Sequence, residues 1–470
     1  MSLISCRKQL FYLEQDQLKV NLMISRQTVF PETRATVKDS WADGDVVFVF
    51  FADVASPKYL EMKYNKGSWV STPKNGLKAS DLSDSGEMTA IYLPYGSDLL
   101  VVNDNGSFKF TKSGEDYFYT GWFLLAEKVI YTFDSELHGS ISLEAPVLDN
   151  RNSLFVHFDI SGVIPGNEYE IYQDYVRPIA LSHISASGVV THSEGEMGKA
   201  IPGYMHTSSI VSFSGILDAS AVGSLKDYQF SVNDKTASIL YTRNAGKKSV
   251  ASSKYIGIGN LKDLGIWKAT KYVYLGINNS EGKKLCWAIY NLGSDVERGE
   301  GSYGDYYAWG GTDGYALSGT FEGGYTSGHD FKSQPYYEVD ANRILKLEYD
   351  AAHVLLSGLW RIPSRDEWIA LADNTECSYS ENASVDYGII LKSKVEGYKD
   401  RSLFLPAAGV VKGFQPTLQG SSGAYWASNE IGADRSAVDI WFGSSADYFV
   451  ISWSNLKEQG QSIRPVFTID

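Results

Sequence analysis

The sequence has little cysteine and no clustered metal ligands. Its 470 residues include only three cysteines, Cys6, Cys286 and Cys377, which are too few for a disulfide scaffold. No Cys-x-x-Cys or His-Glu-x-x-His motif occurs, and the seven histidines are scattered, so a structural zinc site is not expected. We therefore expect domains held by packed apolar cores, with no metal and no cofactor.

Basic clusters and long apolar runs are also lacking. The chain has 56 acidic and 42 basic residues, which gives a formal net charge of −14. Binding to nucleic acid requires clustered lysine and arginine, so a nucleic-acid partner is not expected. No apolar stretch approaches the roughly 20 residues that span a bilayer. Any attachment to a membrane is therefore expected to come from a lipid anchor on a precursor.

One short motif near the first residue bears on export. Leu3-Ile4-Ser5-Cys6 resembles a bacterial lipobox, in which small residues precede a cysteine that receives a lipid. A signal peptide needs a longer apolar stretch upstream of that cysteine. Two alternatives stay open: the start is truncated and Cys6 is the lipidation site, or the match arose by chance.

Aromatic residues, glycine and alternating apolar segments are abundant. Aromatic residues make up 13% of the chain, and there are 44 glycines, a composition that suits strands and turns. Residues 17–25 alternate between polar and apolar, and residues 46–51 are continuously apolar, which predicts a half-buried and a fully buried strand. Helical periodicity is nearly absent before residue 340, so β-sandwiches are predicted there.

The C-terminal third contains the clearest helix signals. Asp350 can cap a helix that begins at Ala351 and that Gly358 ends. Ser364 and Glu367 have the spacing of a capping box, which predicts a second helix after them. We therefore expect a mainly β chain, with sandwiches over residues 7–145 and 146–262 and an α+β domain over residues 263–470.

Ordered motifs in the last domain resemble the FISUMP-type (major paralogous) domain, which is related to C-type-lectin-like folds. They include VYLG at 273–276, CWA at 286–288, YGDYYAWG at 303–310, WRIPS at 360–364, FLPAAG at 404–409, YWAS at 425–428 and SIRPV at 462–466. The resemblance implies a lectin-like domain that is displayed for ligand binding.

The N-terminal part resembles the fimbrillins, which are pilus subunits built from two transthyretin-like sandwiches. The residues that carry this resemblance are Thr33-Arg34-Ala35, Trp41, YNKGSW at 64–69 and AIYLP at 90–94. From 146 to 262 the assignment follows from length and order.

The fimbrillin resemblance implies a route of assembly. In that family a protease cuts after an arginine, the first strand leaves, and a strand of the next subunit enters the groove by β-strand addition. Here the cut is implied between Arg34 and Ala35, with Arg26 as the alternative. The leaving strand is implied to contain Leu18, Val20, Leu22 and Ile24.

The FISUMP-like domain occupies the place where a stalk subunit carries its donor strand. The two resemblances therefore imply a tip adhesin of a fimbrium at the cell surface, exported through the outer membrane as a lipoprotein precursor. Its partners would be other fimbrial subunits and an unidentified host or microbial surface ligand, with glycan as one option. The alternative is a surface lipoprotein that binds glycan without polymerising.

Loop residues of the last domain are the candidates for ligand contact. Aromatic and amide side chains suit a carbohydrate surface, whereas Trp309, Trp426 and Trp441 are expected to be core. Calcium-dependent lectins use a Glu/Gln-Pro-Asn/Asp tripeptide, but here Gln415-Pro416 is followed by Thr417. The candidates are Tyr315, Tyr325, Asn429, Glu430 and Tyr448.

An enzymatic role is not expected. The related fold includes formylglycine-generating oxidases, which need a reactive cysteine pair, and the resemblance allows a disulfide between Cys286 and Cys377. A buried structural cysteine is the alternative, and nothing indicates a lowered thiol pKa. Arg361 and Arg464 recur in the matched motifs and are expected to pair with buried carboxylates such as those of Asp305 or Asp366.

Overall fold

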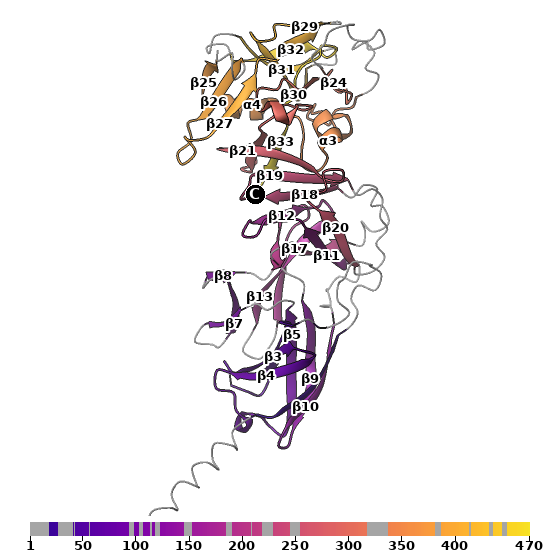
Figure 1. Ribbon diagram of the computed structural model, residues 1–470, viewed down its shortest axis with the longest axis vertical. Coiled ribbons are helices and arrows are strands. Elements are labelled where there is room, and N and C mark those ends of the chain that lie inside the picture. The colour runs from indigo at the N-terminus through magenta and orange to yellow at the C-terminus, as the bar shows by residue number, and fades with distance from the viewer. Residues whose placement is uncertain are drawn as a thin grey trace, which may run out of the picture. The chain divides into compact units, whose positions relative to one another are not determined.

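The computed structural model describes most of the chain and divides it into two compact units. Unit 1 comprises Met1–Lys226 and Lys247–Lys262, and unit 2 comprises Asp227–Gly246 and Asp263–Asp470. The described residues are 18–26, 41, 43–55, 57–93, 98–102, 107–112, 115–117, 123–144, 153–184, 190–207, 209–218, 229–244, 254–316, 337–380, 387–412, 415–431, 436–443 and 449–470. Over these residues the chain is mainly β (Figure 1), which confirms the predicted fold class. No helix among them is long and apolar enough to cross a membrane.

The first sheet of unit 1 has the strand order β1-β10-β9-β5-β2-β3-β4. Its inner strand β2, between β5 and β3, is the apolar run predicted to be fully buried, and all six of its residues are buried. The edge strand β1 runs parallel to β10, whereas the other neighbours are antiparallel. The bounds are β1 (Val20–Arg26), β2 (Val46–Phe51), β3 (Tyr59–Asn65), β4 (Ser68–Lys74), η1 (Ala79–Asp81), β5 (Ser85–Leu93), β9 (Leu124–Phe133) and β10 (Leu137–Leu143).

The second sheet of unit 1 has the order β20-β11-β17-β13-β7-β6, with β14 on β13, β16 on β17 and β8 on β7. Its strands β6 to β8 come from the range predicted as the first sandwich. Outside this sheet, β12 pairs with β15. The bounds are β6 (Asp98–Val102), β7 (Ser107–Lys112), β8 (Glu115–Tyr117), β11 (Ser153–Ser161), β12 (Tyr169–Tyr172), β13 (Val176–Ile184), β14 (Val190–Glu194), β15 (Ile201–Pro202), β16 (Tyr204–Thr207), β17 (Ile210–Asp218) and β20 (Lys254–Asn260).

Unit 2 combines small sheets with short helices. The strands β18, β19, β21, β22 and β33 follow one another in one sheet, and three-stranded sheets are formed by β25-β26-β27 and β30-β31-β32. Residues 229–244, which form the β18–β19 hairpin, fall within the second sandwich predicted for residues 146–262. The structure groups the hairpin with unit 2, because β19 pairs with β21 from Ile239↔Lys271 to Thr242↔Lys268.

The bounds in unit 2 are β18 (Gln229–Asp234), β19 (Ile239–Asn244), β21 (Lys268–Asn278), β22 (Lys284–Ala288), η2 (Val296–Arg298), β23 (Asp305–Tyr306), β24 (Tyr315–Ala316), η4 (Leu347–Tyr349), α3 (Ala351–Leu356), α4 (Arg365–Asp373), β25 (Thr375–Ser380), β26 (Gly388–Ser393), β27 (Ser402–Pro406), β28 (Val410–Lys412), β29 (Gln415–Thr417), β30 (Gly423–Ile431), β31 (Ser436–Phe442), β32 (Val450–Leu456) and β33 (Val466–Ile469). The pairs β23–β24 and β28–β29 complete its strands.

Tryptophans dominate the core of unit 2. Trp287 and Trp368 are fully buried with ring centroids 4.7 Å apart, so α4 is anchored to β22 through this contact. Trp309 and Trp426 are also buried, as predicted. Trp441 differs from the prediction, because its side chain is only partly buried on β31.

Cys286 and Cys377 are both free thiols, so the disulfide considered from the sequence is not formed in this structure. Cys286 is buried in β22, where it pairs with Tyr274 on one side and Phe467 on the other. Cys377 lies in β25, which belongs to a different sheet. Burial raises the pKa of both thiols, which is the reverse of what a reactive cysteine needs.

Candidate functional site

Asp350 joins the two helices of unit 2. Its Oδ1 accepts a hydrogen bond from the His353 backbone N–H at 3.1 Å, which caps α3 as predicted. Its Oδ2 accepts from the Ile362 N–H at 2.7 Å, in the segment that leads into α4. Burial raises the pKa of this carboxyl, although the two N–H donors oppose the rise.

The predicted capping box at the start of α4 is confirmed. The Ser364 N–H donates to Glu367 Oε2 at 2.8 Å, and the Glu367 N–H donates to Ser364 Oγ at 3.3 Å. These two bonds satisfy backbone donors that the first turn of a helix leaves unpaired. They also fix the side chain of Glu367 beside the helix.

The same Glu367 carboxylate forms a bidentate ion pair with Arg361. The Nη1–Oε2 and Nη2–Oε1 distances are 2.7 and 2.5 Å. The prediction that Arg361 pairs with a carboxylate is correct in kind, but the partner is Glu367 and not Asp305 or Asp366. Burial alone would raise the pKa of Glu367, but the guanidinium beside it holds that pKa below the ordinary value.

For Arg464 the predicted carboxylate pairing is wrong. Its side chain is fully buried, and Nε donates to Asn291 Oδ1 at 2.9 Å while Nη1 donates to the Ala288 carbonyl at 3.0 Å. An amide and a carbonyl thus take the place expected for a carboxylate. Burial lowers the pKa of this guanidinium.

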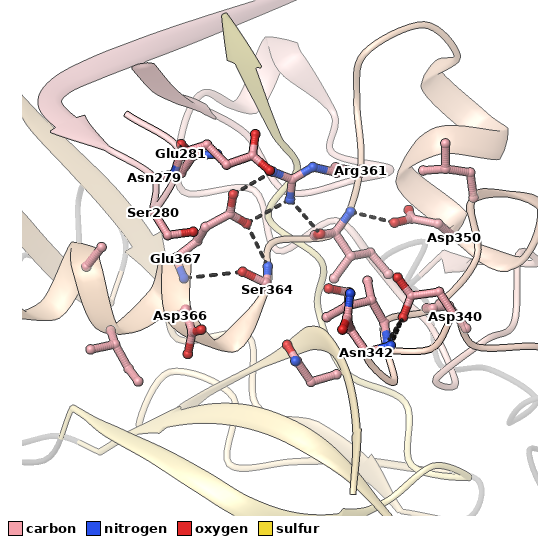
Figure 2. Close-up of a pocket in the computed structure, with 18 of the residues that line it drawn as sticks. Asn279, Ser280, Glu281, Asp340, Asn342, Asp350, Arg361, Ser364, Asp366 and Glu367 are labelled. Carbon is pink, nitrogen blue, oxygen red and sulfur yellow. Dashed lines mark hydrogen bonds and ion pairs between the residues drawn. The ribbon is translucent and has the colours of Figure 1, made fainter. Parts of the chain in front are cut away.

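Asp350, Arg361, Ser364 and Glu367 form one side of a pocket of about 860 Å³ in unit 2. Figure 2 shows Asn279, Ser280 and Glu281 beside the Arg361–Glu367 pair, with Asp340 and Asn342 near Asp350. The lining as a whole comes from the turn between β21 and β22, the loop before η4, the segment that leads into α4, α4 itself and the strand β30. The remaining lining residues are Asn278, Ile344, Leu345, Lys346, Leu347, Ile362, Asp366, Ile369, Ala370, Asp373, Asn374, Ser428 and Asn429.

The rim of this pocket is polar and acidic. Glu281, Asp340, Asp366 and Asp373 are exposed carboxylates in the lining. The lining has only two cations: Arg361 is paired with Glu367, and Lys346 forms an ion pair with Glu338. The lining therefore carries an excess of negative charge that an anionic ligand would meet, although Glu281 and Asp366 each pair with a cation outside the lining.

The loop before η4 owes its shape to Asp340. Its Oδ1 accepts hydrogen bonds from the N–H groups of Asn342 and Ile344, both at 2.8 Å. Asp side chains favour such local turns because they replace the backbone acceptors of a regular element. The Leu345 N–H then donates to the Ser428 carbonyl at 2.9 Å, which fastens the loop to β30.

Among the ligand candidates that the structure describes, Asn429 alone lines the pocket. Its Oδ1 accepts from the Arg365 backbone N–H at 2.6 Å, which fixes the amide at the start of α4. The preceding residue, Ser428, is 2% exposed, and its Oγ has no hydrogen-bond partner among the described residues.

Glu430, another ligand candidate from the sequence, is largely buried. Its side chain is 8% exposed and forms ion pairs with Lys457 at 2.5 Å and with Arg343 at 2.8 Å. The Tyr337 hydroxyl donates to the same carboxylate at 3.1 Å. Glu430 is therefore held in an ion-pair cluster and is not among the residues that line the pocket, although its neighbour Asn429 is.

Several other predicted positions cannot be placed at the pocket. The backbone of Tyr315 lies in β24, paired with Tyr306. The ligand candidates Tyr325 and Tyr448, the lipidation candidate Cys6 and the cleavage candidates Arg34 and Ala35 lie outside the described residues. Among the described residues, no group of three or more His, Cys, Asp or Glu side chains is placed to hold a metal ion.

The predicted leaving strand coincides closely with β1. Leu22 is 9% exposed and belongs to the core of unit 1, and Leu18, Val20 and Ile24 pack against that core. The strand lies at the edge of its sheet and pairs only with β10 in the described sheet order. At its end, the guanidinium of Arg26 lies over the rings of Trp41 and Tyr92.

Comparison with known proteins gives two distant structural similarities. No family model matches the chain, and no curated protein matches it. A protein from Bacteroides ovatus ATCC 8483 that is inferred to act in cell adhesion aligns with 54% of this chain and 95% of its own, at 12% identity and a TM-score of 0.26. An inferred adhesin from Bacteroides ovatus aligns with 47% of this chain and 74% of its own, at 13% identity and a TM-score of 0.20. Similarity at this level is too low to transfer a fold or a function to this chain.

Proposed function

We propose that this protein is a surface adhesin subunit of a fimbrium, in which unit 1 assembles by strand exchange and unit 2 is displayed for ligand binding. The observation that carries the proposal is the position of β1. It is a parallel strand at a sheet edge, and it supplies Leu22 to the core of unit 1.

An edge strand of this kind can be replaced without breaking the rest of the sheet. β1 pairs with β10 from Val20↔Leu137 to Arg26↔Leu143. Removing β1 would expose the backbone edge of β10 and the core beside Leu22, and Ile141 in that core is fully buried. A strand from another subunit could restore both the main-chain hydrogen bonds and the apolar contacts.

The tip position is supported by the pairing of β33. In unit 2, β33 is hydrogen-bonded to β22 from Lys284↔Ile469 to Trp287↔Val466, and Arg361 bridges to Val466 as well. Residues 466–469 therefore cannot act as a donor strand without leaving their own sheet. A subunit whose residues 466–469 are held in its own sheet does not donate this strand, which supports a place at the end of a fimbrium.

The alternative is a surface lipoprotein that binds glycan without polymerising. An arginine-specific protease distinguishes the two, with mass spectrometry of the product and then addition of a peptide with the sequence of residues 18–26. Strand exchange predicts loss of the segment before residue 35 and capture of the peptide by the cut protein.

The matched control is the same peptide with lysine in place of Leu22, because a charge cannot enter the apolar core without a large desolvation cost. The assembly proposal would be contradicted by a cut protein that retains its first strand under mild denaturant. It would also be contradicted by equal capture of the two peptides.

A further inference from the structure

We propose that the pocket between the β21–β22 turn, the loop at residues 340–347 and the start of α4 binds a neutral, hydroxyl-rich carbohydrate. The inference rests on the proposed function in so far as unit 2 is the displayed unit. It names the site and the class of ligand, and neither follows from strand exchange.

The pocket has the size and the rigidity of a binding site. Its volume of about 860 Å³ falls in the range of roughly 300–1,000 Å³ that is usual for small-molecule sites. Arg361, Glu367 and Ser364 are held together by the bidentate ion pair and the capping box. Asp350 ties the segment before α4 to α3 through the Ile362 N–H. A ligand would thus meet side chains whose positions are already fixed.

The chemistry of the walls selects for hydroxyl groups. Carboxamides donate and accept hydrogen bonds, as a sugar hydroxyl does, and carboxylates accept from such hydroxyls. A phosphate or sulfate would face the exposed carboxylates on the rim. A lysine-rich peptide would suit those carboxylates, but its ammonium groups only donate hydrogen bonds and cannot accept from the amide N–H groups. The amides of the lining belong to Asn278, Asn279, Asn342, Asn374 and Asn429.

Ser428 provides an independent indication of a ligand. Both of its backbone polar groups are hydrogen-bonded: its N–H donates to the Pro363 carbonyl, and its carbonyl accepts from the Leu345 N–H, both at 2.9 Å. Ser428 is among the residues that line the pocket, and its hydroxyl is buried with no hydrogen-bond partner among the described residues. Buried hydroxyls are normally satisfied, and a ligand hydroxyl at this point would satisfy this one.

The apolar part of the lining consists of aliphatic side chains. Among the described lining residues there is no aromatic ring, so stacking on a sugar face does not contribute. Ile344, Leu347 and Ile369 are at least partly exposed and can contact the C–H face of a sugar ring. Binding should therefore depend on hydrogen bonds and should change little with salt, because a neutral ligand releases no counterions.

The test uses the full chain and defined probes. We would titrate it by calorimetry with neutral oligosaccharides (lactose, chitotriose and mannotriose), with sialyllactose and with hexalysine. We expect at least one neutral sugar to bind, sialyllactose to bind no better than lactose, and hexalysine not to bind. Ser428→Ala and Asn342→Ala should each lower the affinity for the sugar about tenfold, because each removes one well-placed hydrogen bond.

The control variant is Glu396→Gln, since Glu396 is an exposed carboxylate outside the pocket. It should bind as the parent does. Melting temperatures show whether the variants are folded. The melting temperature of Ser428→Ala should be no lower than that of the parent, because the substitution removes a buried hydroxyl that has no hydrogen-bond partner among the described residues.

Three results would overturn the inference: no neutral sugar binds the parent, the two pocket variants bind it unchanged, or hexalysine binds in a manner that Asp366→Asn abolishes. The strand-exchange assay is separate. A protein that captures the donor peptide but no sugar refutes only the pocket, and one that binds sugar but captures no peptide refutes only the assembly.

Discussion

The guanidinium carbon of Arg26 lies 4.7 Å from the ring centroid of Trp41, at the last residue of β1. A guanidinium over an aromatic face is stabilised by about 0.5–2 kcal/mol. The ring of Tyr92, which lies on β5, is 5.9 Å away. The pair therefore fastens the edge strand to the sheet at the end that a protease would approach.

We predict that the bond after Arg26 resists cleavage in the folded protein. A protease needs extended backbone that is not already paired, and Arg26 is paired with Leu143. Brief digestion with trypsin followed by mass spectrometry should leave this bond intact. Trp41→Ala should speed its cleavage by up to about tenfold, as the loss of the cation–π contact implies. Rapid cleavage after Arg26 in the parent would contradict the role given to this contact.

Gly139 should control how closely β1 approaches β10. It pairs with Leu22, and a Cβ added to it would come within 2.6 Å of Met88 Cε and 3.1 Å of Leu22 Cδ2. Gly139→Val should lower the free energy of unfolding by about 1–3 kcal/mol, which is typical of overpacking. Ser140→Val, on the exposed face one residue later, should change it far less. Equal losses in urea unfolding would show that Leu22 does not need this space.

The Arg361–Glu367 pair should carry much of the local stability around the pocket. Glu367 is 7% exposed in its side chain, so Arg361→Ala would leave a buried carboxylate without its cation. Breaking such a pair costs about 3–5 kcal/mol. Arg365→Ala is the control, because its partner Asp366 is 78% exposed and surface pairs contribute about 1 kcal/mol or less. Similar melting temperatures for the two variants would contradict this difference.

Glu430 should make unit 2 sensitive to acid. Burial opposes its ionisation, but Lys457, Tyr337 and Arg343 together hold its pKa below the ordinary value. A carboxyl with a lowered folded pKa stabilises the protein above its unfolded pKa. It loses that contribution as the pH falls through the folded pKa.

The matched variant is Glu430→Gln. Melting temperatures between pH 7 and pH 3 should fall more steeply for the parent than for the variant, because the variant has no charge to lose at this position. Parallel curves would mean that the ion pairs of Glu430 contribute nothing to stability.

The two described cysteines should differ in reactivity. Cys286 is fully buried, and Cys377 is partly exposed on β25. Alkylation of the native protein, followed by mass spectrometry of its peptides, should label Cys377 slowly and Cys286 only after denaturation. A peptide pair joined through these residues under non-reducing conditions would contradict the free thiols of the structure.

Local sequence signals predicted the parts of the site that depend on neighbours in the chain. The capping box of Ser364 and Glu367 and the cap at Asp350 were predictable because each involves residues three positions apart. The buried run of β2 was equally clear. Its six residues are all Val or Phe, and a run that is this short and rich in β-branched and aromatic residues favours a strand covered on both faces.

The pocket itself could not be predicted, because it brings together residues far apart in the chain. Residues 278–281 and 340–343 contain turn signals of Asn, Ser and Asp, but nothing local indicates that the two turns meet beside α4. Asn429 and Glu430 are neighbours in the chain, but Asn429 lines the pocket and Glu430 is held by Lys457 and Arg343. The partner of Arg361 was missed because Glu367 already had a local role.

The most direct test of the account is hydrogen–deuterium exchange of the β10 backbone, residues 137–143, before and after arginine-specific cleavage. The account predicts slow exchange in the intact protein, fast exchange once the first strand is removed, and slow exchange again when the peptide of residues 18–26 is added. Exchange that stays slow after the first strand has been removed would contradict the claim that β1 is the replaceable strand of this subunit.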